Sequence, residues 1–193
     1  MCSFLETIRV EDGTLCNLKY HQQRLDSVVE KSIDLEDVIT TCKDFPKYGL
    51  FRCRLVYNSF SEVESVTFHS YKKRKITTFK VIFDNVIEYS KKYEDRTKLN
   101  QLFEQRDGCD EILIVKDLKV TDTTIANVAF YRDGVWVTPK NPLLKGTTRQ
   151  RLLDDGFLVE EDIMVHQLRT FTQVALLNAM IEFDIVENFE FLI

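Results

Sequence analysis

The chain has 193 residues, of which 44% are hydrophobic and 30% charged. That length allows one large domain or two small lobes, each with its own core. The net charge of −5 gives no electrostatic basis for binding nucleic acid or an anionic membrane surface, and no apolar run reaches membrane-spanning length.

The cysteines and histidines are few and scattered. An odd number of cysteines without short paired spacings argues against a disulfide framework or a metal site. The opening stretch MCSFLETIRVEDG carries charges too early for a secretory signal. We therefore expect a reduced, cytoplasmic protein that uses no metal.

The first half alternates between strand and helix patterns. Residues 4–10 predict a strand, and apolar spacings of three and four predict a helix from Leu18 to about Glu30. A second helix is expected over 35–42. Further strands are predicted at 50–57, 63–71 and 78–83.

Residues 84–92 are polar and indicate a crossing into a second half. There we expect helices at 99–105 and from the GTT of 146–148 to Gly156, and strands at 110–116, 125–132, 135–139 and 163–165, followed by the apolar run 174–186. The predicted fold is α+β with two lobes, 1–86 and 87–193, and a crevice between them.

Arg24 falls on the apolar face of the first predicted helix, three residues after His21. A buried guanidinium needs a partner. One interpretation is an internal salt bridge; the other is a bound phosphate or carboxylate, which suits the planar fork of arginine.

Two segments of the second half also allow both a structural and a ligand-binding interpretation. Thr147 and Thr148 follow Gly146 at a helix start, where they either cap the helix or help its free N–H groups bind an anion. Asp122 lies in a turn, where it either forms the turn or pairs with a cationic cofactor nitrogen.

Arg52 and Arg54 share one face of an alternating strand, opposite Cys53 and Leu55. Solvent exposure is one reading, and recognition of a dicarboxylate is the other. The stretch IEYSKKYEDRTKLN, residues 87–100, reads as a solvated charge run unless one of its lysines carries chemistry.

The order of three segments resembles the class IV family of pyridoxal-phosphate enzymes. They are FLETIRVEDGTLCNLKYHQQRLDSV, CDEILIVKDLKVTDTTIANVAFYRDGVWVTP and LLKGTTRQRLL. They are similar to the family's H-x-x-R-L helix, its D-E-A-L-L…E-G-S-x-S-N segment and its G-I-T-R segment. The resemblance implies the class IV fold with the cofactor in a crevice between two lobes.

The resemblance also implies roles for individual residues. Arg24 falls on the phosphate-binding arginine, and the GTT segment with Thr147 and Thr148 falls where the phosphate is capped. Asp122 falls on a glutamate that pairs with the pyridinium nitrogen, one methylene shorter here. The spacing of the family's cofactor-binding lysine before the D-E-A-L-like strand selects Lys92.

Lys91 is the neighbour that a one-residue misalignment would choose, and Lys98 lies too close to the strand. Two departures stand out, because KYEDR replaces K-x-L-N and IAN replaces small hydroxyl residues before Asn127.

The run LLNAMIEFDIV resembles that of aminodeoxychorismate lyases, which release pyruvate to give 4-aminobenzoate. In this reading Asn178 lines the phosphate or substrate side, unless it is simply an asparagine at the edge of the core, and Arg52 and Arg54 bind substrate. An aminotransferase for branched-chain or D-amino acids is the alternative, and a degenerate, non-catalytic class IV domain is a third. The family implies a homodimer acting on a small amino substrate.

Overall fold

The computed structural model describes residues 2–193. The chain divides into two compact units. The first comprises the chain through Lys73 together with Lys91–Asp95, and the second comprises Arg74–Ser90 and Arg96–Ile193. The expected division at residue 86/87 differs from this one. Residues 78–83 form a strand that pairs within the second unit, whereas residues 91–95 bond to the first.

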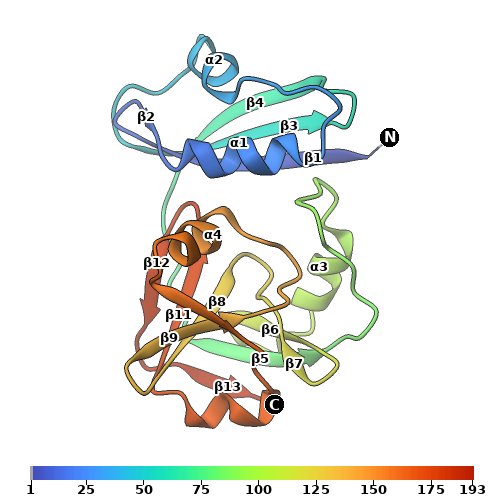
Figure 1. Ribbon diagram of the computed structural model, residues 1–193, viewed down its shortest axis with the longest axis vertical. Coiled ribbons are helices and arrows are strands. Elements are labelled where there is room, and N and C mark those ends of the chain that lie inside the picture. The colour runs from blue at the N-terminus through green and yellow to red at the C-terminus, as the bar shows by residue number, and fades with distance from the viewer. Residues whose placement is uncertain (1) are drawn as a thin grey trace. The chain divides into compact units, whose positions relative to one another are not determined.

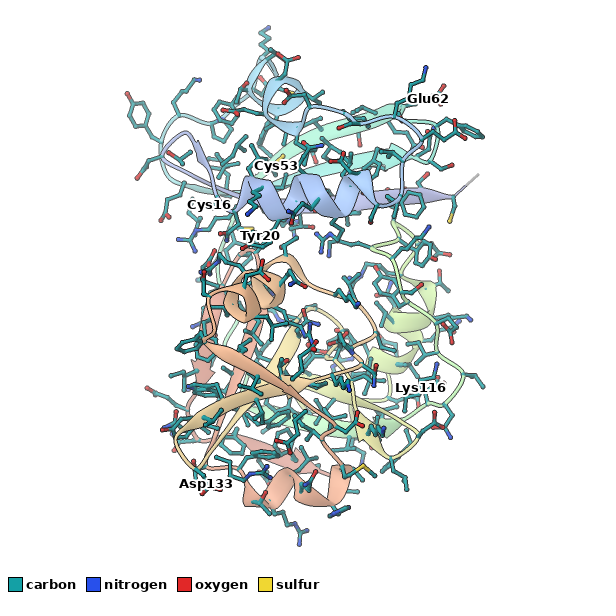
Figure 2. The ribbon with its side chains drawn as sticks, viewed as in Figure 1. Cys16, Tyr20, Cys53, Glu62, Lys116 and Asp133 are labelled. Carbon is teal, nitrogen blue, oxygen red and sulfur yellow. The ribbon has the colours of Figure 1, made fainter. Side chains whose placement is uncertain are left out.

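The first unit is a sheet with two helices. Its elements are β1 (Ser3–Glu11), β2 (Thr14–Leu15), α1 (Leu18–Asp26), α2 (Leu35–Thr40), β3 (Leu50–Asn58) and β4 (Val63–Ser70). The strands are ordered β2-β1-β3-β4 and α1 contacts β1 (Figure 1). Ile8, Leu25, Ile39 and Cys53 are fully buried in its core, and Cys53 is labelled in Figure 2.

The second unit contains two sheets. One has the order β13-β5-β6-β7, formed by β5 (Thr78–Phe83), β6 (Glu111–Lys116), β7 (Lys119–Val120) and β13 (Glu190–Leu192). The other has the order β10-β9-β8-β11-β12, formed by β8 (Asn127–Arg132), β9 (Val135–Pro139), β10 (Leu158–Glu161), β11 (Gln173–Asn178) and β12 (Glu182–Val186).

Alternate side chains along the strands of the second unit pack into two different hydrophobic clusters. On β8, Val128 and Phe130 pack toward Leu113 and Val115 of β6, whereas Ala129 faces Leu152 on the other side. Leu152 belongs to α4 (Thr147–Asp154), which contacts β10 and β11 (Figure 1). Helix α3 (Thr97–Phe103) contacts β6.

Most predicted elements are confirmed, with shifted ends. Helix α1 stops at Asp26 rather than near Glu30, because the Ser27 hydroxyl donates to the Arg24 carbonyl at 2.6 Å and the chain turns there. Helix α2 ends at Thr40, α3 covers 97–103 instead of 99–105, and β8 begins at Asn127.

The strand expected at 163–165 is wrong. Met164 forms an isolated bridge with Lys119, and a 3₁₀-helix, η1 (Val165–Thr170), follows at once. The facing strand β7 has only two residues, so the pairing cannot extend. Strand β10, which pairs in parallel with β9, and strand β13 were not expected.

Candidate active site

A buried carboxylate organises the first unit. Glu6 is fully buried on the same face of β1 as Phe4 and Ile8. It accepts hydrogen bonds from Arg24 Nε at 2.8 Å and Nη2 at 2.5 Å. Burial alone would raise the pKa of Glu6, but the charge and hydrogen bonds of Arg24, with the bond to His21, lower it to about 2.

His21 completes this buried cluster. Its Nδ1 lies 2.6 Å from Glu6 Oε2. Burial lowers the pKa of His21, the bond to Glu6 offsets part of this, and the positive charges of Arg24 and Lys92 lower it further. His21 is therefore neutral at physiological pH, and Nδ1 carries the proton, because an ionised carboxylate can only accept.

The structure bears on the first of the two interpretations of Arg24, the internal salt bridge. The internal salt bridge is present, and it uses one edge of the guanidinium fork. The Arg24 side chain is 14% exposed, so Glu6 fixes its direction without burying it completely. Phosphate binding by Arg24 stays a prediction.

Lys92 lies in the segment that joins the first unit. The Leu5 N–H donates to the Lys92 carbonyl at 2.8 Å, and a tight turn is closed by the Tyr93 N–H and the Lys91 carbonyl at 2.9 Å. Lys92 is half-buried and contributes to the electrostatic environment of His21. Lys91 and Lys98 are exposed, and Lys98 lies in α3.

The strand pattern around Arg52 and Arg54 is confirmed. Cys53 and Leu55 are buried, while Arg52 is exposed and Arg54 half-buried. Arg54 Nη2 donates to Glu94 Oε1 at 2.9 Å, which ties β3 to the segment carrying Lys92. Their binding of substrate stays a prediction.

Asp122 lies in the second unit, between β7 and β8, and is 4% exposed. Its Oδ1 accepts from Asn127 Nδ2 at 2.7 Å and its Oδ2 from the Leu144 N–H at 2.9 Å. Burial raises the pKa of Asp122 to about 7, although these donors and the charge of Arg149 favour the ionised form.

The start of α4 carries the two predicted threonines. Gly146 is the N-cap residue, and Thr147 and Thr148 are 5% and 1% exposed. Within residues 2–193 Thr148 Oγ1 is buried without a hydrogen-bond partner. A buried hydroxyl at a helix N-terminus with no partner is what an anion-binding site presents before its ligand binds.

Asn178 ends β11 and holds two pieces of chain. Its Oδ1 accepts from the N–H groups of Met180 at 2.9 Å and Ile181 at 3.1 Å, shaping the turn to β12. Its Nδ2 donates to the Ile125 carbonyl at 3.2 Å, within the loop that follows Asp122. These contacts fit the structural reading; contact with a ligand stays a prediction.

The sequence reading missed several residues at these clusters. Glu6 could have been found, since alternation places it on the buried face between Phe4 and Ile8 and a buried carboxylate needs a cation. Arg149 could not have been found in this way. It is 1% exposed, and its Nη2 donates to the Pro139 carbonyl at 2.8 Å and to Glu160 at 2.6 Å, partners on two other elements that no spacing pattern connects to it.

A third missed residue, Glu111, is fully buried and steadies the loop after Asp122. Its Oε1 accepts from Thr124 Oγ1 at 2.7 Å, and Arg96 Nη2 donates to the Thr124 carbonyl at 2.7 Å. Across residues 2–193, no three His, Cys, Asp or Glu side chains are grouped to hold a metal ion. Nor does the described chain contain a helix long and apolar enough to cross a membrane.

The chain belongs to the amino-transferase class IV family, whose model matches residues 92–188. The resemblance read from the three motifs is thereby confirmed, as is the mixed α and β class of the fold. Members of this family are generally enzymes that use pyridoxal phosphate.

Relatives of known structure support the same assignment. A protein from Haemophilus somnus named "putative 4-amino-4-deoxychorismate lyase" is 36% identical, with a TM-score of 0.86, over 93% of this chain and 97% of its own. A hypothetical aminotransferase from Mycobacterium tuberculosis, solved with pyridoxal phosphate bound, is 19% identical with a TM-score of 0.82, covering 98% and 81% of the two chains, and shares the fold.

One curated relative matches locally. A protein from Schizosaccharomyces pombe named "putative aminodeoxychorismate lyase" is 45% identical over 65 residues, which cover 31% of this chain and 28% of that protein.

Proposed function

We propose that this protein is a pyridoxal-phosphate-dependent lyase that releases pyruvate from 4-amino-4-deoxychorismate and yields 4-aminobenzoate. The observation that carries the proposal is the 36% identity with the Haemophilus somnus protein of that name, which extends over nearly the whole of both chains. The local match to the Schizosaccharomyces pombe protein supports the same substrate.

The residues of the second unit fit the phosphate of the cofactor. Thr148 Oγ1 is an unpartnered hydroxyl in a buried position beside the first N–H groups of α4. An anion there accepts these donors and gains from the helix dipole. Thr147 and Thr148 are the proposed phosphate ligands of this unit, and Arg24 is a further proposed ligand that the family resemblance implies.

Asp122 fits the ring nitrogen of the cofactor. Bound pyridoxal phosphate supplies a ring that accepts an electron pair from substrate carbon, and it does so best with its nitrogen protonated. An ionised Asp122 would accept a hydrogen bond from the protonated ring nitrogen and so keep the proton on that nitrogen. The pKa of Asp122 is raised to about 7 by burial, and a positive charge placed beside the carboxylate would favour its ionised form.

Lys92 is the proposed covalent residue and proton carrier. Its Nζ would hold the cofactor covalently, which requires the neutral amine rather than the ammonium ion. The same neutral Nζ would also take a proton from one substrate atom and return it to another. In the proposed reaction pyruvate leaves and the remaining ring becomes aromatic.

The first test is covalent capture. Purified protein titrated with pyridoxal phosphate should develop a visible absorbance band, and borohydride reduction followed by peptide mass spectrometry should place the cofactor on Lys92. Lys92→Ala should lose both signals, whereas Lys91→Ala and Lys98→Ala, matched changes at neighbouring exposed lysines, should keep them. Absence of the band in the wild-type protein would favour a non-catalytic class IV domain.

A second assay separates the two enzyme classes. The lyase produces 4-aminobenzoate and pyruvate in equal amounts from 4-amino-4-deoxychorismate. A class IV aminotransferase would instead convert its bound cofactor to the amine form when mixed with glutamate alone. The second result without the first would replace the lyase assignment by the aminotransferase.

The homodimer implied by the family is part of this proposal. Light scattering of the purified protein across a range of concentrations would test it.

A further inference from the structure

Asn127 uses every polar atom of its side chain. Nδ2 donates to Asp122 Oδ1 at 2.7 Å and to the Leu144 carbonyl at 2.7 Å. Oδ1 accepts from the Gly146 N–H at 3.1 Å. A primary amide offers two N–H groups and one carbonyl, and Asn127, 5% exposed, places all three on protein partners.

Leu144 closes the arrangement into a ring of hydrogen bonds. Its carbonyl accepts from Asn127, while its N–H donates to the other oxygen of Asp122 at 2.9 Å. Asp122, Asn127 and Leu144 are therefore each bonded to the other two. The loop that leads to α4 cannot shift without breaking a bond to Asp122 or Asn127.

Gly146 extends the ring to the start of α4. A Cβ built on Gly146 would lie 2.0 Å from Asn127 Oδ1, so the backbone meets the amide with no room for a side chain. Gly146 is the N-cap of α4 and precedes Thr147 and Thr148. Asn127 thus holds the helix start on one side and Asp122 on the other.

We infer that Asn127 is a positioning residue that couples the two ends of the proposed cofactor site, fixing the Asp122 carboxylate relative to the phosphate-binding turn at Gly146–Thr148. The inference deepens the proposed function and rests on it for the ligand. The coupling itself concerns only residues of the second unit.

Only a side-chain amide supplies the two donors and one acceptor that Asp122, Leu144 and Gly146 require at this position. Aspartate at this position would lose both donors and set a second carboxylate beside Asp122, and an apolar residue would leave the Gly146 N–H and the Leu144 carbonyl unpaired. Arg149 of α4 also acts on Asp122 and favours its ionised form. Removing Asn127 would leave Asp122 with the charge of Arg149 and the N–H groups of Leu143 and Leu144.

The ligand experiment compares pyridoxal phosphate with pyridoxal, which lacks the phosphate. Binding of each is measured by absorbance for the wild-type protein, Asn127→Ala, Asn127→Asp and the control Asn85→Asp, a surface-turn asparagine of the same unit. Both Asn127 variants should lose about tenfold or more of the preference for the phosphorylated ligand. Asn85→Asp should keep the wild-type preference.

A second readout is independent of any ligand. The ¹³C chemical shift of the Asp122 carboxyl, followed against pH in the cofactor-free protein, should show its midpoint moved upward in Asn127→Ala, because a donor to the ionised form has been removed; in Asn127→Asp the added carboxylate raises the midpoint by itself, so this readout rests on Asn127→Ala. A purely structural asparagine would weaken both ligands equally and leave this midpoint in place.

The outcomes separate the inference from the proposed function. If folded Asn127 variants keep both the phosphate preference and the Asp122 midpoint, the coupling is overturned. If the wild-type protein binds no pyridoxal phosphate, the proposed function fails, and the ¹³C midpoint alone then decides for or against the coupling. Should Asn127→Ala not fold, the phosphate preference of Asn127→Asp, which keeps the side-chain size, decides it.

Discussion

At the scale of single residues, two of the buried acids of this protein, Glu6 and Asp122, have pKa values shifted in opposite directions. Glu6 is surrounded by a guanidinium and an imidazole, and its pKa falls to about 2. Asp122 has neutral donors and a less dominant cation, and burial raises its pKa to about 7. The partner, rather than burial alone, decides the charge of each carboxyl group.

Replacing Glu6 by glutamine should destabilise the protein by roughly 3 kcal/mol at pH 7, because Arg24 would lose its buried counter-charge. The folded pKa of Glu6 lies below its unfolded value, so this contribution is present above about pH 4.5 and is lost as the pH falls toward 2. Urea unfolding of the wild-type protein and of Glu6→Gln at pH 7 and pH 3 measures the size of the loss and its decrease at low pH. Glu30→Gln, at an exposed glutamate of the same unit, is the control; an equal loss at both pH values would contradict the assignment.

Asp122→Asn should change the pH dependence of stability in the cofactor-free protein. The folded pKa of Asp122 is raised from 3.8 to about 7, so its contribution is full below about pH 4 and is lost as the pH rises toward 7. The wild-type minus Asp122→Asn difference in unfolding free energy should therefore fall across this window. His21, buried with a lowered pKa, acts in the opposite direction in both proteins and cancels.

A difference that stays flat from pH 4 to 7 would show that Asp122 is already ionised throughout. Thermal or urea unfolding in buffers of constant ionic strength suffices for the measurement.

At the scale of elements, the sequence predicted strands and helices well where one face is apolar. The alternation of β3 and the spacing of α1 are local signals, and both elements begin where they were expected, although α1 ends earlier, at Asp26. Strand β10 has no such signal, because Leu158 alone is buried in it and its pairing with β9 brings together distant segments.

The same limit applies to the candidate site. Arg24, Asp122 and Thr148 could be selected from motif order, but Arg149 and the fit of Gly146 against Asn127 depend on contacts across the chain. Side-chain type and spacing do not reveal such contacts.

At the N-terminus of α4, one substitution should affect stability and cofactor binding in different ways. Thr148→Val keeps the shape of the side chain but removes a buried hydroxyl without a partner. We expect unchanged stability or a gain of up to about 1 kcal/mol, together with roughly tenfold or greater weakening of pyridoxal phosphate binding. Unfolding midpoints and absorbance titrations measure the two effects.

Thr40→Val, at an exposed position in α2, should leave cofactor binding unchanged. A Thr148→Val protein that is less stable yet binds the cofactor normally would mean that the hydroxyl serves the fold alone.

At the scale of the whole molecule, the path of the chain matters most. The chain leaves the first unit after Lys73, returns for Lys91–Asp95 and leaves again at Arg96. The returning segment is anchored by Tyr93, whose ring centroid lies 5.7 Å from that of Phe4, and by the backbone bridge between the same residues. Lys92 is therefore presented by the packing of a neighbouring aromatic residue.

Tyr93→Ala should lower the unfolding free energy by about 2 kcal/mol, since a half-buried ring is removed from a core. It should also reduce the fraction of Lys92 captured by borohydride at subsaturating cofactor, because the segment is held less firmly. Tyr48→Ala, at a tyrosine of the same unit that is 86% exposed, is the matched control. Full capture at Lys92 in a destabilised Tyr93→Ala protein would show that the anchor serves only the fold.

This path of the chain has a consequence for the exchange of gene segments between related proteins. A gene segment that encodes residues 1–73 lacks the lysine, and one that begins at residue 74 contains the lysine but not the sheet on which it rests. Neither unit can be exchanged between relatives as one contiguous piece of DNA without separating Lys92 from Leu5 and Phe4. A shuffled gene with a crossover near residue 73 takes the sheet from one parent and the Lys92 segment from the other, so its protein should capture less cofactor on Lys92 than either parent does.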